Sequence, residues 1–97
     1  MSKTYILTPK ADEDLVVIWL YTRETWGLDQ ANKYLNELED QFHRLVEKPD
    51  LGKKCNNIRT GYRYFHIKHH LVIYRNLNKQ LEIVRILHER MNIPNHF

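Results

Sequence analysis

The spacing of apolar residues changes once along the chain, from a helical period to a strand-like period, and this change restricts the fold more than any other feature. In the first half, apolar stripes at helical spacing cover residues 11–22 and 31–45. After Pro49, three short segments rich in aromatic and β-branched residues follow one another. The sequence therefore predicts an α+β fold, with two helices packed on one β-sheet.

Two helices are expected in the first half of the chain. Thr8-Pro9 predicts the start of the first, because threonine is a favoured N-cap and proline suits the first helical position, and residues 12–14 (Asp-Glu-Asp) place negative charge where the helix dipole favours it. Gly27 is expected to end it, and the second helix is expected to run from near Leu28 or Asp29 to just before Pro49. The buried stripes are predicted to comprise Ala11, Leu15, Ile18, Trp19 and Thr22 in the first helix and Ala31, Leu35, Leu38, Phe42 and Leu45 in the second. Because few residues join the helices, we expect an antiparallel helical hairpin.

The strand-like segments predict one sheet. Tyr62–Ile67, Leu71–Arg75 and Leu81–His88 are expected to form a three-stranded antiparallel meander, because the connections between them are short enough for hairpins. The N-terminal strand, Tyr5–Leu7, is expected to join this sheet, and residues 50–61 are expected to form a loop. With no linker or repeat, residues 1–97 are expected to form a single domain.

Composition excludes several classes of protein. Hydrophobic residues make up 42% of the chain and charged residues 28%, which is typical of a globular protein and not of a disordered one. No apolar run approaches the roughly 18 residues of a membrane span, and the N-terminus has no signal-peptide pattern, so we expect a cytoplasmic protein that does not enter a membrane. Cys55 cannot form an internal disulfide and is expected to have no chemical role.

A set of residues in a fixed order carries a resemblance to a known family. In the first half these residues are Ala11, Asp14-Leu15, Ile18, Tyr21, Trp26-Gly27, Gln30-Ala31, Tyr34, Pro49 and Gly52. The more specific ones in the second half are Ile58-Arg59, Gly61-Tyr62-Arg63, Phe65, His70, Val72-Ile73, Tyr74-Arg75 and the run from Val84 to Met91. In this order they resemble the ParE toxins of bacterial toxin-antitoxin pairs, within the RelE/ParE superfamily. The superfamily fold, one strand, two helices and a three-stranded meander, agrees with the order predicted from periodicity.

The resemblance implies a toxin that is neutralised by a ParD-like antitoxin. Several ParE toxins trap DNA gyrase with its DNA broken, whereas relatives in the RelE branch cut messenger RNA on the ribosome. We expect the gyrase mechanism, in which the protein acts by binding, uses no cofactor and is not an enzyme. Ribosome-dependent mRNA cleavage is the alternative. A third reading, an isolated basic RNA-binding domain, fits the charge but leaves the ordered ParE-like positions unexplained.

Charge is unevenly distributed along the chain. Residues 1–50 contain six Lys or Arg and ten Asp or Glu, a net charge of −4, whereas residues 51–97 contain nine and two, a net charge of +7, which together give +3. An acidic partner is therefore expected to bind the second half. Nucleic acid, an acidic antitoxin segment and an acidic patch on an enzyme all fit this charge, and we do not expect direct nucleic-acid binding to be the main activity.

The nuclease alternative makes specific demands on the chain. Cleavage through the 2′-hydroxyl needs a base, an acid and cations that stabilise the negative charge. On this alternative the active-site residues are Lys53, Lys54, Arg63, Arg85 and His88. However, RelE-type nucleases characteristically carry a tyrosine or a histidine-tyrosine combination at the end of the last strand, and no tyrosine follows Leu87-His88 here. We therefore expect no catalytic residue.

The expected binding residues lie mainly in the basic half. Those expected to contact the target are Arg59, Arg63, Arg75, Arg85, His88, Arg90, Met91 and Phe97. Those expected to contact the antitoxin are Leu15, Trp19, Trp26 and Arg75. No metal site is expected from the six histidines, because neighbours such as His69 and His70 point to opposite faces of an extended chain.

Overall fold

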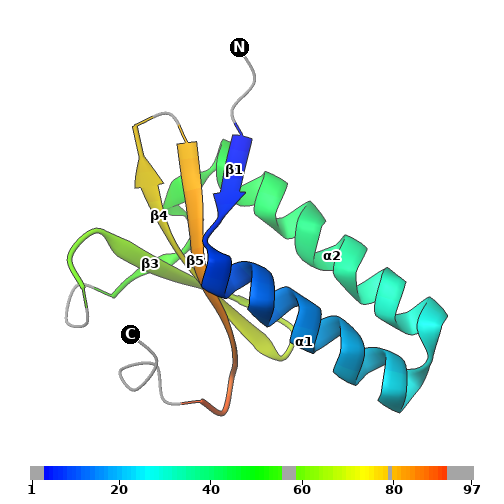
Figure 1. The fold of residues 1–97 in the computed structure, drawn as a ribbon. Helices are drawn as coiled ribbons and strands as arrows, with labels where there is room; N and C mark the ends of the chain where they lie inside the picture. Colours follow the sequence, from blue (N-terminus) through cyan, green and yellow to red (C-terminus); the bar gives the residue numbers. More distant parts are fainter. Residues whose placement is uncertain (1–3, 56–58, 79, 92–97) are drawn as a thin grey trace.

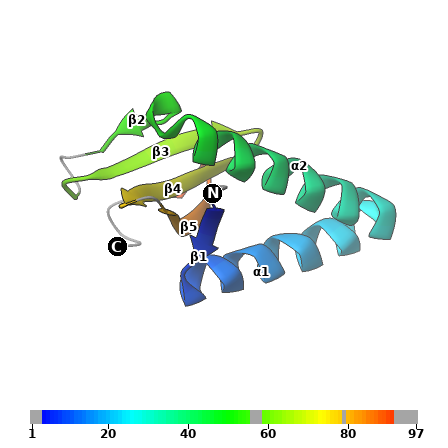
Figure 2. The same cartoon turned by 90° about the horizontal axis from the view of Figure 1, so that it is seen from above.

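The computed structural model describes residues 4–55, 59–78 and 80–91. In this part of the chain, a helical hairpin packs against a five-stranded sheet with the strand order β1-β5-β4-β3-β2 (Figures 1 and 2). The elements are β1 (Thr4–Leu7), α1 (Pro9–Trp26), α2 (Leu28–Glu47), the short 3-10 helix η1 (Pro49–Leu51), β2 (Lys53–Lys54), β3 (Tyr62–Ile67), β4 (His70–Leu77) and β5 (Gln80–His88). The predicted α+β fold is confirmed, and the hairpin turn at Gly27 lies beyond the edge of the sheet (Figure 1).

The predicted meander is confirmed, with longer strands and tighter turns than the sequence indicated. β3 has the predicted bounds, whereas β4 and β5 each extend past theirs. The turns are short because Lys68 and Asn78 adopt left-handed backbone angles, with φ of 51° and 49°, as tight hairpin turns require. The expected loop of residues 50–61 was wrong in one respect, since it contains η1 and a fifth strand, β2, paired with β3. A strand of two lysines has no alternating pattern and therefore could not be predicted from the sequence.

The first strand and the first helix together cover one edge of β5. β1 runs parallel to β5 and ends where Leu7 pairs with Ile83. Thr8 continues the contact, because its N–H donates to the Ile83 carbonyl at 3.0 Å and its hydroxyl donates to the Val84 carbonyl at 2.7 Å. The same hydroxyl accepts a hydrogen bond from the Ala11 N–H and so caps α1, as predicted. One side chain therefore ends the strand and starts the helix.

The two helices differ in how they bury apolar residues. α2 buries the predicted Ala31, Leu38, Phe42 and Leu45, but Leu35 is only half-buried and Tyr34 is buried beside it. In α1, Ala11 and Thr22 are buried, and Leu15 and Ile18 are half-buried against the core.

No helix in the described residues is long and apolar enough to cross a bilayer.

A contact between Tyr34 and His70 ties α2 to the sheet. The Tyr34 hydroxyl lies 2.7 Å from His70 Nδ1, and the imidazole of His88 packs edge-on against that of His70 with the ring centroids 5.5 Å apart. Burial, together with the smaller effects of His88 and His69, lowers the pKa of His70 from 6.5 to about 4, while Glu89 and Asp14 act in the opposite direction. His70 is therefore neutral at pH 7, and its Nδ1 can accept a hydrogen bond from the Tyr34 hydroxyl.

This contact makes stability depend on pH. Because the pKa of His70 is about 4 when folded and 6.5 when unfolded, the unfolded chain binds more protons between these values. The stability that neutral His70 contributes is thus fully present above pH 6.5 and is lost as the pH falls towards 4. We expect a loss of about 1 to 2 kcal/mol, less than the full linkage value because the ring keeps some contact with water.

Urea unfolding of the wild type and of His70→Gln over this range measures the effect. His70→Gln should flatten the pH dependence, whereas the matched change His43→Gln, at an exposed position of α2, should leave it unchanged. Equal pH dependence in the wild type and His70→Gln would contradict the assignment.

Candidate functional site

A row of arginine and tyrosine side chains crosses the sheet on the face away from the helices. Tyr62, Arg75 and Glu82 lie directly opposite one another on β3, β4 and β5. The guanidinium carbons of Arg59 and Arg75 lie 5.8 and 5.5 Å from the centroid of the Tyr62 ring, so cation-π contacts hold both cations against it. The Arg75 Nε donates to Glu82 at 2.7 Å, and this bond raises the pKa of Arg75. We call Arg59, Tyr62, Arg75 and Glu82 the arginine-tyrosine row.

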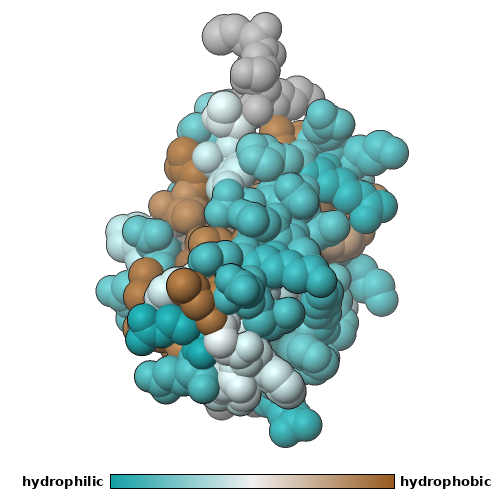
Figure 3. Space-filling model, turned by 90° about the vertical axis from the view of Figure 1, so that its right-hand side faces the viewer, coloured by the Kyte–Doolittle hydropathy of each residue, from teal (hydrophilic) through white to brown (hydrophobic). Residues whose placement is uncertain are grey.

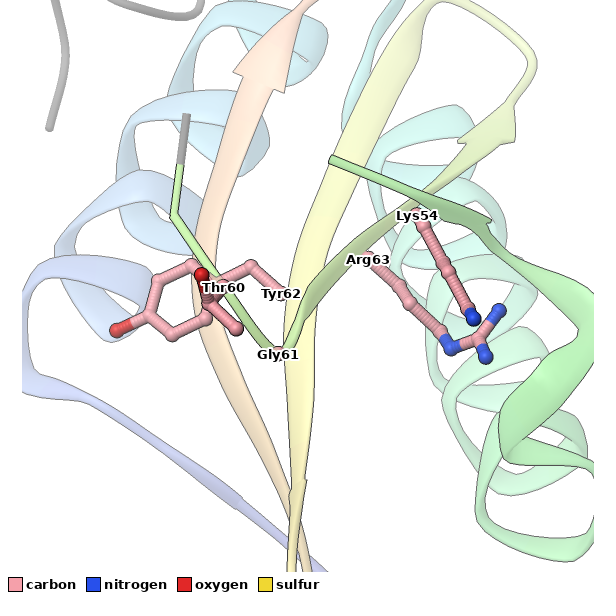
Figure 4. A pocket seen from close by; sticks show the side chains of 5 residues that line it. All are labelled: Lys54, Thr60, Gly61, Tyr62 and Arg63. Carbon is pink, nitrogen blue, oxygen red and sulfur yellow. The ribbon is translucent and has the colours of Figure 1, made fainter. Parts of the chain in front are cut away.

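A shallow hollow lies next to this row. It has a volume of about 300 Å³ and is lined by Lys54, Thr60, Gly61, Tyr62 and Arg63. Lys54 and Arg63 are opposite one another on β2 and β3, and their side chains extend on the same side of the sheet, away from the Tyr62 ring (Figure 4). Two adjacent cations favour an anionic ligand here.

Arg63 also has a structural role. It donates to the Gly52 carbonyl at 2.8 Å and lies 3.3 Å from the Asp50 carboxylate. Tyr74 holds the same turn, because its buried hydroxyl donates to the Pro49 carbonyl and accepts from the Gly52 N–H. A side chain at Gly52 would collide with the Tyr74 ring, so only glycine fits there. Arg63 and Tyr74 together hold the turn that leads into β2 and thus place Lys54.

Arg85, on β5, is held by a side chain of α1. Its Nε and Nη2 donate to the two carboxylate oxygens of Asp14 at 2.8 and 3.0 Å, and the side chains are only 19% and 15% exposed. The bond to Asp14 raises the pKa of Arg85. Of the five residues of the nuclease alternative, the hollow brings together Lys54 and Arg63. Lys53 is exposed on β2, and Arg85 and His88 belong to contacts elsewhere.

The histidines near the end of β5 interact with other protein groups. His88 packs against His70, and its Nδ1 accepts from the Arg90 N–H at 3.2 Å. The Glu89 carboxylate lies 3.0 Å from a ring nitrogen of His66 and 3.0 Å from one of His69, and the bond to His69 lowers the Glu89 pKa most. Residues 4–55, 59–78 and 80–91 contain no group of three His, Cys, Asp or Glu side chains that could hold a metal.

The remaining predicted residues occupy separate parts of the surface. Arg90 and Met91 are exposed after β5, and Phe97 lies outside the described residues. Trp19 is half-buried, with its Nε1 donating to the Asn32 side chain at 3.0 Å, and Trp26 is 71% exposed at the hairpin turn. Leu15 packs against the core and Arg75 belongs to the arginine-tyrosine row.

Cys55 is 3% exposed, and burial raises its pKa, which disfavours the reactive thiolate.

Sequence reasoning missed two kinds of feature. It assigned surface roles to Arg75 and Arg85 without finding their carboxylate partners, because nothing in the sequence joins Asp14 to Arg85 across 71 positions. It also missed an exposed apolar face of α1. That face had a signal, since apolar residues occur at positions 16, 17, 20 and 21, outside the predicted stripe.

Comparison with known proteins agrees with this fold over nearly its whole length. The family model described as "ParE toxin of type II toxin-antitoxin system, parDE" matches residues 5–93. "Toxin ParE1" of Mycobacterium tuberculosis is 39% identical over 96% of each chain, and "Toxin ParE1" of Caulobacter vibrioides is 38% identical over 97% of each chain. A solved structure titled "Chromosomal ParDE TA system from P. aeruginosa" has a similar fold, with a TM-score of 0.74, 23% identity, and coverage of 91% of this chain and 95% of that one. The chain therefore belongs to the ParE toxin family of type II toxin-antitoxin systems.

Proposed function

We propose that this ParE-family toxin binds DNA gyrase in the cytoplasm, traps its cleavage complex and is neutralised by a ParD-like antitoxin. The near full-length match to ParE toxins carries the proposal. The arginine-tyrosine row supports it, since it holds the cations of Arg59 and Arg75 against the buried ring of Tyr62 on the sheet face away from the helices, where a partner with acidic groups can bind. The basic sheet is thus the proposed contact for gyrase.

Action by binding, without catalysis, fits the arrangement of the nuclease residues. RNA cleavage needs an acid and a base within hydrogen-bond reach of the same reacting group. Lys54 and Arg63 supply charge in the hollow, but the imidazole of His88 packs against His70 and Arg85 is held by Asp14. Among the described residues of the nuclease alternative, none is placed beside Lys54 and Arg63 to act as the acid or the base.

A cleavage assay tests the target. This toxin, purified gyrase, supercoiled plasmid and ATP should yield linear DNA after detergent and protease treatment, in proportion to the toxin bound, since nothing turns over. Arg59→Ala should reduce linear DNA about tenfold by weakening contact with gyrase, whereas Lys33→Ala, on the exposed face of α2, should have no effect.

Two results would contradict the gyrase proposal. Gyrase that stays fully active in excess toxin is one. The other is a transcript cut in the ribosomal A site by toxin that leaves plasmid DNA intact, which would establish the RelE-type activity instead.

We propose that the antitoxin binds both the hairpin and the basic sheet. Trp26 offers a large exposed apolar surface at the hairpin turn, and Arg75 offers charge for acidic side chains on the sheet face away from the helices. Because burial of apolar area gives the larger part of such affinities, salt should weaken the complex only moderately.

Calorimetry with the antitoxin tests whether apolar burial contributes more to the affinity than charge does. We expect a negative heat-capacity change and at least tenfold weaker binding for Trp26→Ala. The matched control Tyr21→Ala, at a similarly exposed aromatic residue on α1, should bind as the wild type does. Complete loss of binding at about 0.5 M salt would show that screened surface charges hold the complex.

A further inference from the structure

The outer face of α1 is apolar although it faces water. Val16, Val17, Leu20 and Tyr21 are 54%, 65%, 40% and 66% exposed. Seen from the side of the hairpin, hydrophobic surface gathers where α1 lies, whereas the surface over α2 is mostly hydrophilic (Figure 3). A helix with apolar residues on opposite faces is typical of one that is covered on both sides. The sheet and α2 cover only the inner face of α1.

Charged residues frame this apolar face in a symmetric way. Lys10, Val17 and Glu24 are separated by seven positions each, with Glu13 and Leu20 between them, which is the spacing of a heptad seam. Val17 is the midpoint, and Lys10 and Glu24 lie about 10 Å along the axis on either side of it. Lys10 and Glu24 therefore carry opposite charges at equal distances from the centre of the face.

We propose that the outer face of α1 binds the same face of a second copy of this chain, with the two α1 helices antiparallel and a two-fold axis at Val17. This axis places Lys10 opposite Glu24 of the second copy, twice in each dimer, and brings the valine and leucine side chains of both copies together. A parallel arrangement would instead place Lys10 beside Lys10 and Glu24 beside Glu24. The charges thus select the antiparallel pair.

In the monomer, the outer face of α1 is accessible to a second copy of the chain. Lys10 and Glu13 are 3.8 Å apart with side chains about 70% exposed, a weak contact that Lys10 can exchange for Glu24 of the second copy. In the view from above, α1 forms one border, and none of the described helices and strands lies outside it (Figure 2). A contact between two single helices is smaller than the interface of a permanent dimer, so we expect weak and reversible association.

Sedimentation equilibrium of the full chain measures this self-association without gyrase or antitoxin, so its result is independent of the proposed function. The mass should rise from the monomer value of 11.9 kDa towards twice that value over about two decades of concentration. Val17→Asp places an acidic side chain on the axis and should weaken dimerisation at least tenfold. It should not unfold the chain, because Val17 is exposed in the monomer.

A charge exchange tests the register. Lys10→Glu sets two carboxylates against each other at each end and should weaken the dimer, and adding Glu24→Lys should restore it to within about threefold. Lys33→Glu, an equal charge change on the outer face of α2, should have no effect. A protein that stays monomeric throughout, a dimer that survives Val17→Asp, or a double variant that is not restored would each overturn the proposal.

Discussion

The carboxylate of Asp14 is the contact on which the junction of helix and sheet depends. It binds the Arg85 guanidinium through both oxygens and also accepts a hydrogen bond from the Ile86 N–H at 2.9 Å. β1 ends opposite Ile83, and among the described residues no further strand pairs with that edge of β5. Asp14 accepts the hydrogen bond from the Ile86 N–H that a neighbouring strand would otherwise accept. The guanidinium of Arg85 compensates the negative charge of the Asp14 carboxylate. Because both side chains are largely buried, loss of either would leave a charge without its partner in a poor solvent for ions.

A second set of contacts fixes the opposite edge of the sheet. Tyr74 and Arg63 satisfy both backbone groups of Gly52 and thereby hold the turn that precedes β2. Burial raises the pKa of Tyr74, which keeps its hydroxyl protonated to donate to the Pro49 carbonyl. The cationic hollow is thus a product of the fold, since the same arginine that lines it also supports the strand carrying Lys54. A variant of Arg63 would change the surface charge and the position of β2 together.

The sequence predicted those parts of the fold that local patterns encode. The helical hairpin, the Thr8 cap and the three strands of the meander follow from periodicity and turn residues, and the structure confirms them. β2 escaped prediction because its two lysines gain strand structure only by pairing with β3. Asp14 was assigned to the helix dipole because its position in the first turns is visible in the sequence. Its partner lies in the last strand, and only the folded chain brings the two together.

The sequence likewise reveals the overall charge of the surface but not the contacts of each charged side chain. The basic character of the second half was evident from counting charges, but the partners of each arginine were not, and these partners decide which cations remain available. Arg85 is held by Asp14, whereas Arg59 and Arg75 lie against Tyr62 on the sheet face away from the helices. The outer face of α1 lies on the other side of the sheet from this row, so a second copy bound there leaves the row accessible. The geometry therefore allows self-association and the binding of an acidic partner at the same time, through surfaces that share no residue.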